Sequence, residues 1–257
     1  MPDTHFTGSV RNRVSEAEWQ ARLDCAACYR LLPIFGMSDL VYNHVTTRIS
    51  GEGERFLINP FGWMYEEITA SSLITIDLDG KTIFNPHEGI GINYAGYVIH
   101  SAVHGARPDV GCVIHTHTRA GMAVSAMTCG LLPLTQTAMR CMPVVYHDYE
   151  GPAVDLDERA RLVADLGEAR FMILRNHGLL TCGPTTAEAF NAMYWLEMAC
   201  RAQVDAMAAR TELTMPAAPV VANAIHLYDP RTRRPFGILE WPAMLRMLDR
   251  RDPSWRT

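Results

Sequence analysis

The segment 113–118 reads Val-Ile-His-Thr-His-Thr and continues a short apolar run that begins at Val110. A short apolar run of this kind, bounded by turn signals, predicts a buried β-strand over 110–116. Side chains two positions apart on a strand project from the same face, so His115 and His117 are expected to point the same way. The pair alone is weak support for a metal site, because histidines often alternate near strand ends.

A third histidine, His177, lies in the segment 174–178, which reads Leu-Arg-Asn-His-Gly. It follows a predicted strand at 171–174 and precedes a glycine-bounded turn, a position from which its ring could reach the same pocket as His115 and His117. Three neutral imidazoles that leave coordination positions open suit a catalytic divalent metal. Zinc, manganese and iron(II) are all admissible, and imidazole suits zinc and iron better than manganese.

The helices expected around these segments carry start signals as well as apolar periodicity. A first helix is predicted over 15–32, with Ser15 as N-cap and Glu18 as its capping-box partner. Thr185 and Glu188 repeat this capping pattern at the start of a long helix. Apolar spacing predicts further helices at 97–106, at 118–129, around 157–165 and at 186–209.

Two β-hairpins are predicted in the first third of the chain. Segments 73–78 and 81–84 flank the dipeptide 79–80, Asp-Gly, which supplies the positive φ angles of a type I′ turn. Segments 43–50 and 56–59 form the other hairpin. Together with the strands near the histidines, these hairpins indicate an α/β protein.

Composition limits the class of protein. The chain has 257 residues, 48% of them hydrophobic and 20% charged, which suits a single domain over 1–257. Its core is expected at about 15–210, with a C-terminal tail at 211–257 that starts in a stretch rich in proline and alanine. The net charge of -5 and the scattered arginines argue against a nucleic acid partner.

The N-terminal residues show no signal-peptide pattern, and no apolar run approaches the roughly 20 residues of a membrane span. A cytoplasmic protein without a membrane partner is therefore expected. The seven cysteines are an odd number, and several lie among apolar neighbours, which favours reduced core thiols over a disulfide framework. The pair Cys25 and Cys28 is interpreted as structural, because it lies in a predicted helix without a second such pair.

The linked motifs resemble the class II aldolase/adducin family. The resemblance rests on segment 113–118 preceded by Ala-Arg-Pro-Asp at 106–109, on segment 174–178, and on the order of elements from about Ser15 to Ala209. It implies a three-layer α/β/α fold of the adducin-head type, in which helices flank a central, mainly antiparallel sheet.

The resemblance also carries functional expectations. It implies one divalent metal ion per chain, zinc being the first choice, bound by His115, His117 and His177. It implies a small-molecule substrate and a homo-oligomer, usually a tetramer, with sites at subunit interfaces. In such an assembly, tail residues such as Tyr228 or Trp241 could complete the pocket of a neighbouring subunit.

Two departures from the sugar-phosphate aldolases of the family stand out. There, a Ser-Ser-Glu segment before the His-x-His motif provides serines for the phosphate and a glutamate as acid/base; the aligned residues here are Tyr94, Ala95 and Gly96. A glycine-containing phosphate loop corresponds here to segment 40–43, Leu-Val-Tyr-Asn, and only Asn43 is kept. Because a phosphate nest needs unhindered backbone amides, a standard sugar phosphate is not the expected substrate.

Two functions remain open. The first is a divalent-metal-dependent lyase that acts on a small carbonyl or carboxylate substrate, by aldol cleavage or decarboxylation, with the metal as Lewis acid. The second is a non-catalytic adducin-like binding or scaffold module. The missing glutamate and phosphate loop favour the second function, whereas the three retained histidines favour the first.

Segment 146–151 is dense in titratable groups, and its candidates for proton transfer are His147, Asp148, Tyr149 and Glu150. His147 and Glu150 are the preferred catalytic residues, and a polar turn is the alternative interpretation of the segment. Arg119 could bind a substrate carboxylate or make only a surface contact. His100 and His104 are interpreted as hydrogen-bonded packing residues. The candidates for substrate binding are Asn43, His44 and Tyr94.

Overall fold

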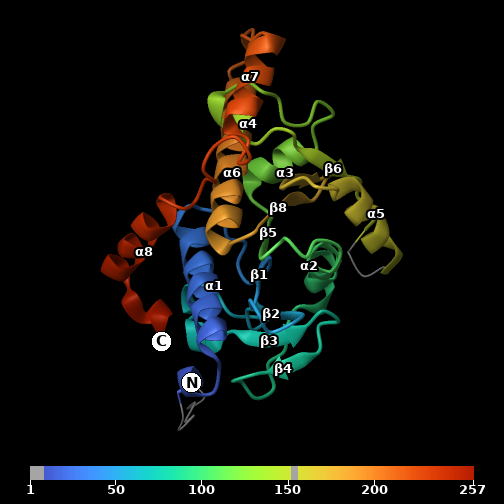
Figure 1. Cartoon of the computed structure of the whole chain (residues 1–257). Helices are drawn as coiled ribbons and strands as arrows, with labels where there is room; N and C mark the ends of the chain where they lie inside the picture. The colour runs from blue at the N-terminus through green and yellow to red at the C-terminus, as the bar shows by residue number, and fades with distance from the viewer. Residues whose placement is uncertain (1–8, 152–155) are drawn as a thin grey trace.

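The computed structural model describes residues 9–151 and 156–257. Their strands form an eight-stranded sheet of order β4-β3-β2-β1-β5-β8-β7-β6 (Figure 1). Neighbouring strands are antiparallel except for β6 and β7, which are parallel. The predicted central, mainly antiparallel sheet is confirmed. The strands are β1 His44–Arg48, β2 Arg55–Ile58, β3 Ile74–Asp77, β4 Thr82–Phe84, β5 Cys112–Thr116, β6 Val145–His147, β7 Phe171–Leu174 and β8 Gly178–Gly183.

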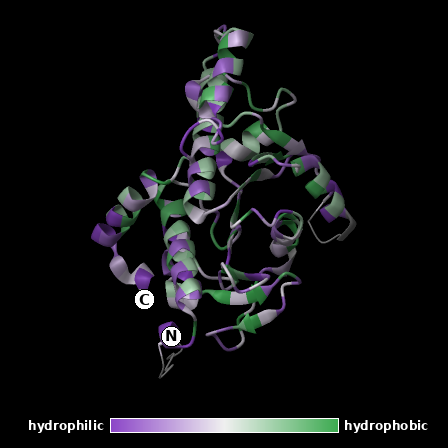
Figure 2. Ribbon diagram, viewed as in Figure 1, coloured by the Kyte–Doolittle hydropathy of each residue, from purple (hydrophilic) through white to green (hydrophobic). Residues whose placement is uncertain are grey.

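Helices cover both faces of this sheet, which confirms the three-layer arrangement (Figure 1). Buried residues of α1, α3, α6 and α8 form one hydrophobic cluster with the sheet, and those of α2 and α5 form another. Hydrophobic and hydrophilic segments alternate along α5 (Figure 2), as expected for a helix with one face on a sheet. The helices are α1 Glu16–Ile34, α2 Tyr94–Ala106, α3 Arg119–Ser125, α4 Gln136–Arg140, α5 Leu156–Leu166, α6 Thr186–Ala208, α7 Ala218–Tyr228 and α8 Glu240–Arg251.

Strand β5 lies between β1 and β8 and contributes to both layers. Ile114 packs in the cluster of α1 and α6, whereas Val113 packs in the cluster of α2 and α5. His115 lies two residues after Val113 and therefore faces the α2/α5 layer. Across the strand pair, His115 is opposite His44 of β1.

Both predicted helix N-caps are confirmed, but the capping boxes predicted for α1 and α6 were wrong. In α6, the Glu188 carboxylate accepts a hydrogen bond from Thr185 Oγ1 at 3.3 Å instead. Ser15 Oγ accepts a hydrogen bond from the backbone N–H of Glu18 at 3.0 Å, and Thr185 caps α6 in the same way. The Glu18 carboxylate, however, accepts hydrogen bonds from Arg22 Nε and Thr75 Oγ1, both at 2.8 Å. Because Arg22 is fully buried, Glu18 is needed as its counterion and does not return to the cap.

Other predicted boundaries changed for local reasons. The β3/β4 turn has a positive φ only at Gly80 (+79°) and not at Asp79, so the type I′ prediction was wrong. Helix α2 begins at Tyr94 rather than residue 97, because Asn93 is its N-cap. Helix α3 ends at Ser125 and does not extend to residue 129.

The C-terminal residues form α7 and α8 beyond the sheet (Figure 1). Trp241 of α8 is buried, and its Nε1 donates a hydrogen bond to Asp24 Oδ1 of α1 at 3.0 Å. Trp241 therefore packs in its own chain, contrary to the expectation that it could complete a neighbour's pocket. Tyr228 of α7 contacts Arg140, whose guanidinium lies 5.0 Å from the ring centroid.

The cysteine pair in α1 is structural, as expected. Cys25 and Cys28 are free and buried, and burial raises the pKa of Cys25 to about 12 and that of Cys28 well above its ordinary value. Such thiols stay protonated and unreactive. None of the helices within 9–151 and 156–257 combines the length and the apolar character that crossing a membrane requires.

Candidate metal centre

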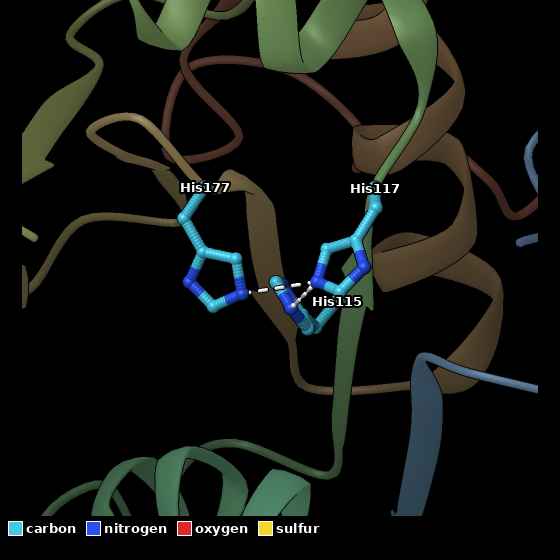
Figure 3. Close-up of side chains that lie close together, drawn as sticks. All are labelled: His115, His117 and His177. Atoms are coloured by element: carbon cyan, nitrogen blue, oxygen red, sulfur yellow. Dashed lines mark hydrogen bonds between the residues drawn. The ribbon is translucent and has the colours of Figure 1, made fainter. Parts of the chain in front are cut away.

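Three histidine rings converge beside the carboxyl end of β5 (Figure 3). His115 is on β5, His117 follows the strand by one residue, and His177 is in the turn between β7 and β8. His117 Nε2 lies 2.9 Å from His115 Nε2 and 2.9 Å from His177 Nε2. One ligand atom from each residue therefore lies within 4.8 Å of the others.

The second ring nitrogen of two of these histidines has a fixed partner. His115 Nδ1 lies 2.9 Å from the carbonyl oxygen of Leu179, and His117 Nδ1 lies 3.1 Å from Asp39 Oδ2. Carbonyl and carboxylate oxygens accept hydrogen bonds, so Nδ1 carries the hydrogen in each neutral ring. The lone pairs of the two Nε2 atoms then face each other, an arrangement that repels unless a cation or a proton lies between them.

Burial favours the neutral form of His115 and His177, the form of imidazole that binds metals. Desolvation lowers the pKa of His115 well below its ordinary value, and the neighbouring His177 and His117 lower it further. Desolvation, followed by the effect of His117, lowers the pKa of His177 to about 4. The rings of His115 and His177 therefore offer lone pairs at neutral pH without first losing a proton.

Two asparagines with positive φ angles support the segments that carry the histidines. Asn43, with φ +75°, accepts a hydrogen bond from the backbone N–H of His117 on its Oδ1 at 3.1 Å. Asn176, with φ +54°, donates its backbone N–H to the carbonyl oxygen of Ser125 at 3.2 Å. Asparagine tolerates this conformation better than most residues other than glycine. The asparagine retained in segment 40–43 thus positions a histidine.

A cavity of about 370 Å³ borders the three histidines. Among the described residues that line it there is no lysine, arginine or carboxylate; the wall is made of neutral polar and apolar side chains. Besides the histidine triad, the wall includes Asn43, His44, Asn93, Ile99, Tyr149 and Asn176. The described lining side chains therefore offer no formal counter-charge to a charged molecule.

The predicted substrate-binding residues differ in their positions. Asn43 and His44 line the cavity, whereas Tyr94 does not belong to its wall. Tyr94 is the first residue of α2, and its side chain is exposed and reaches toward Gly80. His44 is buried, and neither of its ring nitrogens has a hydrogen-bond partner.

The predicted catalytic residues have other partners or positions. His147 Nδ1 lies 2.8 Å from Asp165 Oδ2, which joins β6 to α5. Glu150 forms an ion pair with Arg161 of α5. Arg119 is exposed at the first position of α3. None of the three predicted residues, His147, Glu150 and Arg119, is among those that line the 370 Å³ cavity.

Two further residues contribute to the site: Asp39, which the sequence analysis did not assign, and Tyr149, which was one of the four proton-transfer candidates. Asp39 orients His117 across a sequence separation of 78 residues, and a lone aspartate before the altered loop gave no signal of this. Tyr149 lines the cavity, and its ring centroid lies 6.1 Å from that of His177. Its place in the titratable segment 146–151 was the available signal.

A second group of histidines lies on the same sheet face under α2. Thr46 Oγ1 lies 2.8 Å from His100 Nδ1 and 2.8 Å from His104 Nε2. One hydroxyl can donate to one ring and accept from the other. His100 and His104 are buried, and the expected hydrogen-bonded packing role is confirmed.

Comparison with known proteins identifies the family. A family model described as Class II Aldolase and Adducin N-terminal domain matches residues 23–204. The chain belongs to this family. The resemblance drawn from the histidine motifs is thereby confirmed, and the family offers both enzymes and adducins as relatives.

Similar proteins span these two groups. An aldolase II superfamily protein from Pseudomonas syringae has 47% sequence identity and a TM-score of 0.93, covering 97% of this chain and 100% of that chain. An L-fuculose 1-phosphate aldolase from Glaciozyma antarctica has 26% identity and a TM-score of 0.82, covering 100% and 97% respectively. Mouse alpha-adducin is 45% identical over 80% of this chain, a match that covers 28% of the adducin.

Proposed function

We propose that this chain is a divalent-metal-dependent lyase that breaks a carbon–carbon bond in a small carbonyl or carboxylate substrate, by aldol cleavage or decarboxylation. The observation that carries the proposal is the convergence of the Nε2 atoms of His115, His117 and His177. Two of these lone pairs are fixed toward each other by Leu179 and Asp39, which fits a bound cation.

The residues present fit such an ion. The three histidines would hold it, and zinc is the first choice, with manganese or iron as alternatives. When bound, a divalent metal supplies a Lewis acid that polarises a substrate oxygen next to the bond that breaks. The membership in a class II aldolase family supports lyase chemistry at this coarse level.

The chain's own residues would bind the substrate and move the proton. The cavity beside the histidines admits a small molecule, and Asn43 keeps His117 in position. Among the titratable residues of segment 146–151, Tyr149 lines this cavity and is assigned proton transfer. His147 and Glu150 would serve to fix the same segment to α5 through Asp165 and Arg161.

A standard sugar phosphate is not the proposed substrate. The described wall lacks the cationic side chains that recognise a phosphate dianion, and Gly96 stands where related aldolases have a glutamate. The proposal extends to a cytoplasmic homotetramer of single-domain subunits with sites between subunits. Nucleic acids and membranes are not proposed as partners.

Elemental analysis of protein purified without an affinity tag tests this function. We expect about one metal ion per chain in the wild type, none in His115→Ala, and a melting temperature that falls on chelation. His104→Gln is the matched control, because this buried histidine lies outside the centre and should leave the metal content unchanged. Metal-loaded protein would then be screened against hydroxyketones and aromatic carboxylic acids.

The similarity to alpha-adducin supports a second candidate, a non-catalytic binding or scaffold module. The replacement of the family glutamate by Gly96 points the same way. Such a module should hold no metal, and its melting curve should be indifferent to chelator and to added zinc, manganese or iron. That outcome would remove the lyase proposal.

A further inference from the structure

We infer that His44 and Gly96 form a matched pair in which the His44 imidazole occupies the space of a side chain at position 96 and hydrogen-bonds the substrate. The ligand class is a small, unphosphorylated hydroxycarbonyl compound whose carbonyl end is at the metal. This inference rests on the proposed metal centre and adds a recognition element to it.

The steric part of the inference follows from the distances at Gly96. A Cβ atom placed on Gly96 would lie 2.0 Å from His44 Cε1 and 2.5 Å from His44 Nδ1. Both distances are far below van der Waals contact, so the ring and any side chain at 96 exclude each other. His44 can take its observed position only because residue 96 is glycine.

The polar part follows from hydrogen bonds that are missing. His44 is only 3% exposed, and neither Nδ1 nor Nε2 has a partner. The Nδ2 of the adjacent Asn43 is also buried without a partner. A buried polar group without a partner costs stability, and such groups in native proteins call for an explanation. Both residues line the cavity beside the metal centre, so a bound ligand would supply the partners.

The position of His44 relative to the ligands defines what it could contact. His44 of β1 lies directly opposite His115 of β5 in the strand register. A molecule with one end at the three histidines can therefore place a neighbouring hydroxyl group against His44. The neutral cavity wall matches an uncharged hydroxyl rather than a phosphate ester.

Two hydroxamates that differ by one hydroxyl group test this contact. Acetohydroxamate and glycolohydroxamate both chelate metal, and only glycolohydroxamate carries the additional hydroxyl. Calorimetric titration of the zinc-loaded protein should give about 3- to 10-fold tighter binding of glycolohydroxamate to the wild type, as expected for one neutral hydrogen bond. His44→Leu should lose this preference while keeping its zinc and its affinity for acetohydroxamate, and His44→Gln should restore part of it.

The matched control is His104→Gln, in which a buried histidine outside the cavity wall is changed and the preference should persist. If His44→Leu kept the wild-type preference, the contact would be refuted while the metal centre stood. If the wild type bound neither zinc nor hydroxamate, the proposed function and this inference would fall together.

The exclusion between the two residues has a separate test that needs neither metal nor ligand. Gly96→Ala should lower the melting temperature of metal-free protein, because Cβ displaces the His44 ring. In protein that already carries His44→Ala, the further change Gly96→Ala should lower the melting temperature much less, since the space is then free. If Gly96→Ala lowered the melting temperature equally in the wild type and in His44→Ala, the pairing would be overturned.

Discussion

Two groups of histidines lie on the α2 side of the sheet, and their ring nitrogens have different partners. In the group under α2, His100 and His104 share the hydroxyl of Thr46, so each ring has a protein partner. In the group at the end of β5, the Nε2 atoms of His115 and His117 face each other instead. Burial is common to both groups, and each ring under α2 also keeps one buried nitrogen without a partner, His100 Nε2 and His104 Nδ1. The comparison teaches that the convergence of Nε2 atoms from three rings, more than burial, distinguishes the candidate metal centre from packing.

The largest expected difference is the effect of removing one ring from each group. His177→Ala removes one of the three proposed ligands. Loss of a residue that hydrogen-bonds a ligand reduces metal affinity by about 10- to 100-fold, and His177→Ala should reduce zinc affinity by more than that. His104→Gln should leave zinc affinity within about 2-fold, because its ring faces Thr46. Competition with a chromophoric chelator measures both, and equal losses would erase the distinction between the groups.

A smaller loss is expected when the partner of His117 is changed. Asp39→Asn should weaken zinc binding by about 10- to 100-fold, because the carboxylate that fixes the ring and strengthens its basicity is gone. Asp165→Asn is the matched control, since that carboxylate bonds His147 outside the cavity wall. Unchanged zinc affinity in Asp39→Asn would show that His117 does not depend on this contact.

Removing the shared hydroxyl should affect stability and not metal binding. Thr46→Val keeps the shape of the side chain but leaves the facing nitrogens of His100 and His104 without a partner. The expected cost is about 1–3 kcal/mol in the free energy of unfolding, measured by urea denaturation of metal-free protein. The zinc content of this variant should equal that of the wild type. Loss of zinc would contradict the separate roles of the two histidine groups.

The last expected effect concerns pH. Burial, followed by the charge of Arg48, lowers the pKa of His104 to about 3 from the ordinary 6.5. The unfolded chain then binds more protons than the native one between these values, so stability is full above about pH 6.5 and falls as the pH drops toward 3. His104→Gln should reduce the proton uptake on unfolding in this window by about one, as measured by the slope of stability against pH. An unchanged slope would mean that His104 is already charged in the native state.

The sequence predicted the features that depend on local patterns. The i, i+2 spacing placed His115 and His117 on one face, and Ser15 and Thr185 were recognised as caps because an N-cap lies within one turn of its partner. The family resemblance then added the topology, since the order of strands in a sheet is not a local property.

Contacts between distant segments were not predictable in this way. Asp39 reaches His117 from 78 residues away, and the approach of His44 to Gly96 depends on how α2 crosses β1. Glu18 illustrates the same limit, because a buried arginine claims the carboxylate that local spacing assigned to the cap. Tertiary packing decides these partners after the local elements have formed.

The position of β5 in the sheet has a consequence for how the centre would open. Its backbone is hydrogen-bonded to β1 on one side and to β8 on the other, so its amides should be among the slowest to exchange with deuterated water. His115 is thereby held on a segment that stays in place during local fluctuations. His177 is in a turn. If the proposed metal is bound, His177 should be the ligand that departs first, and metal exchange should follow the opening of that turn without unfolding of the sheet.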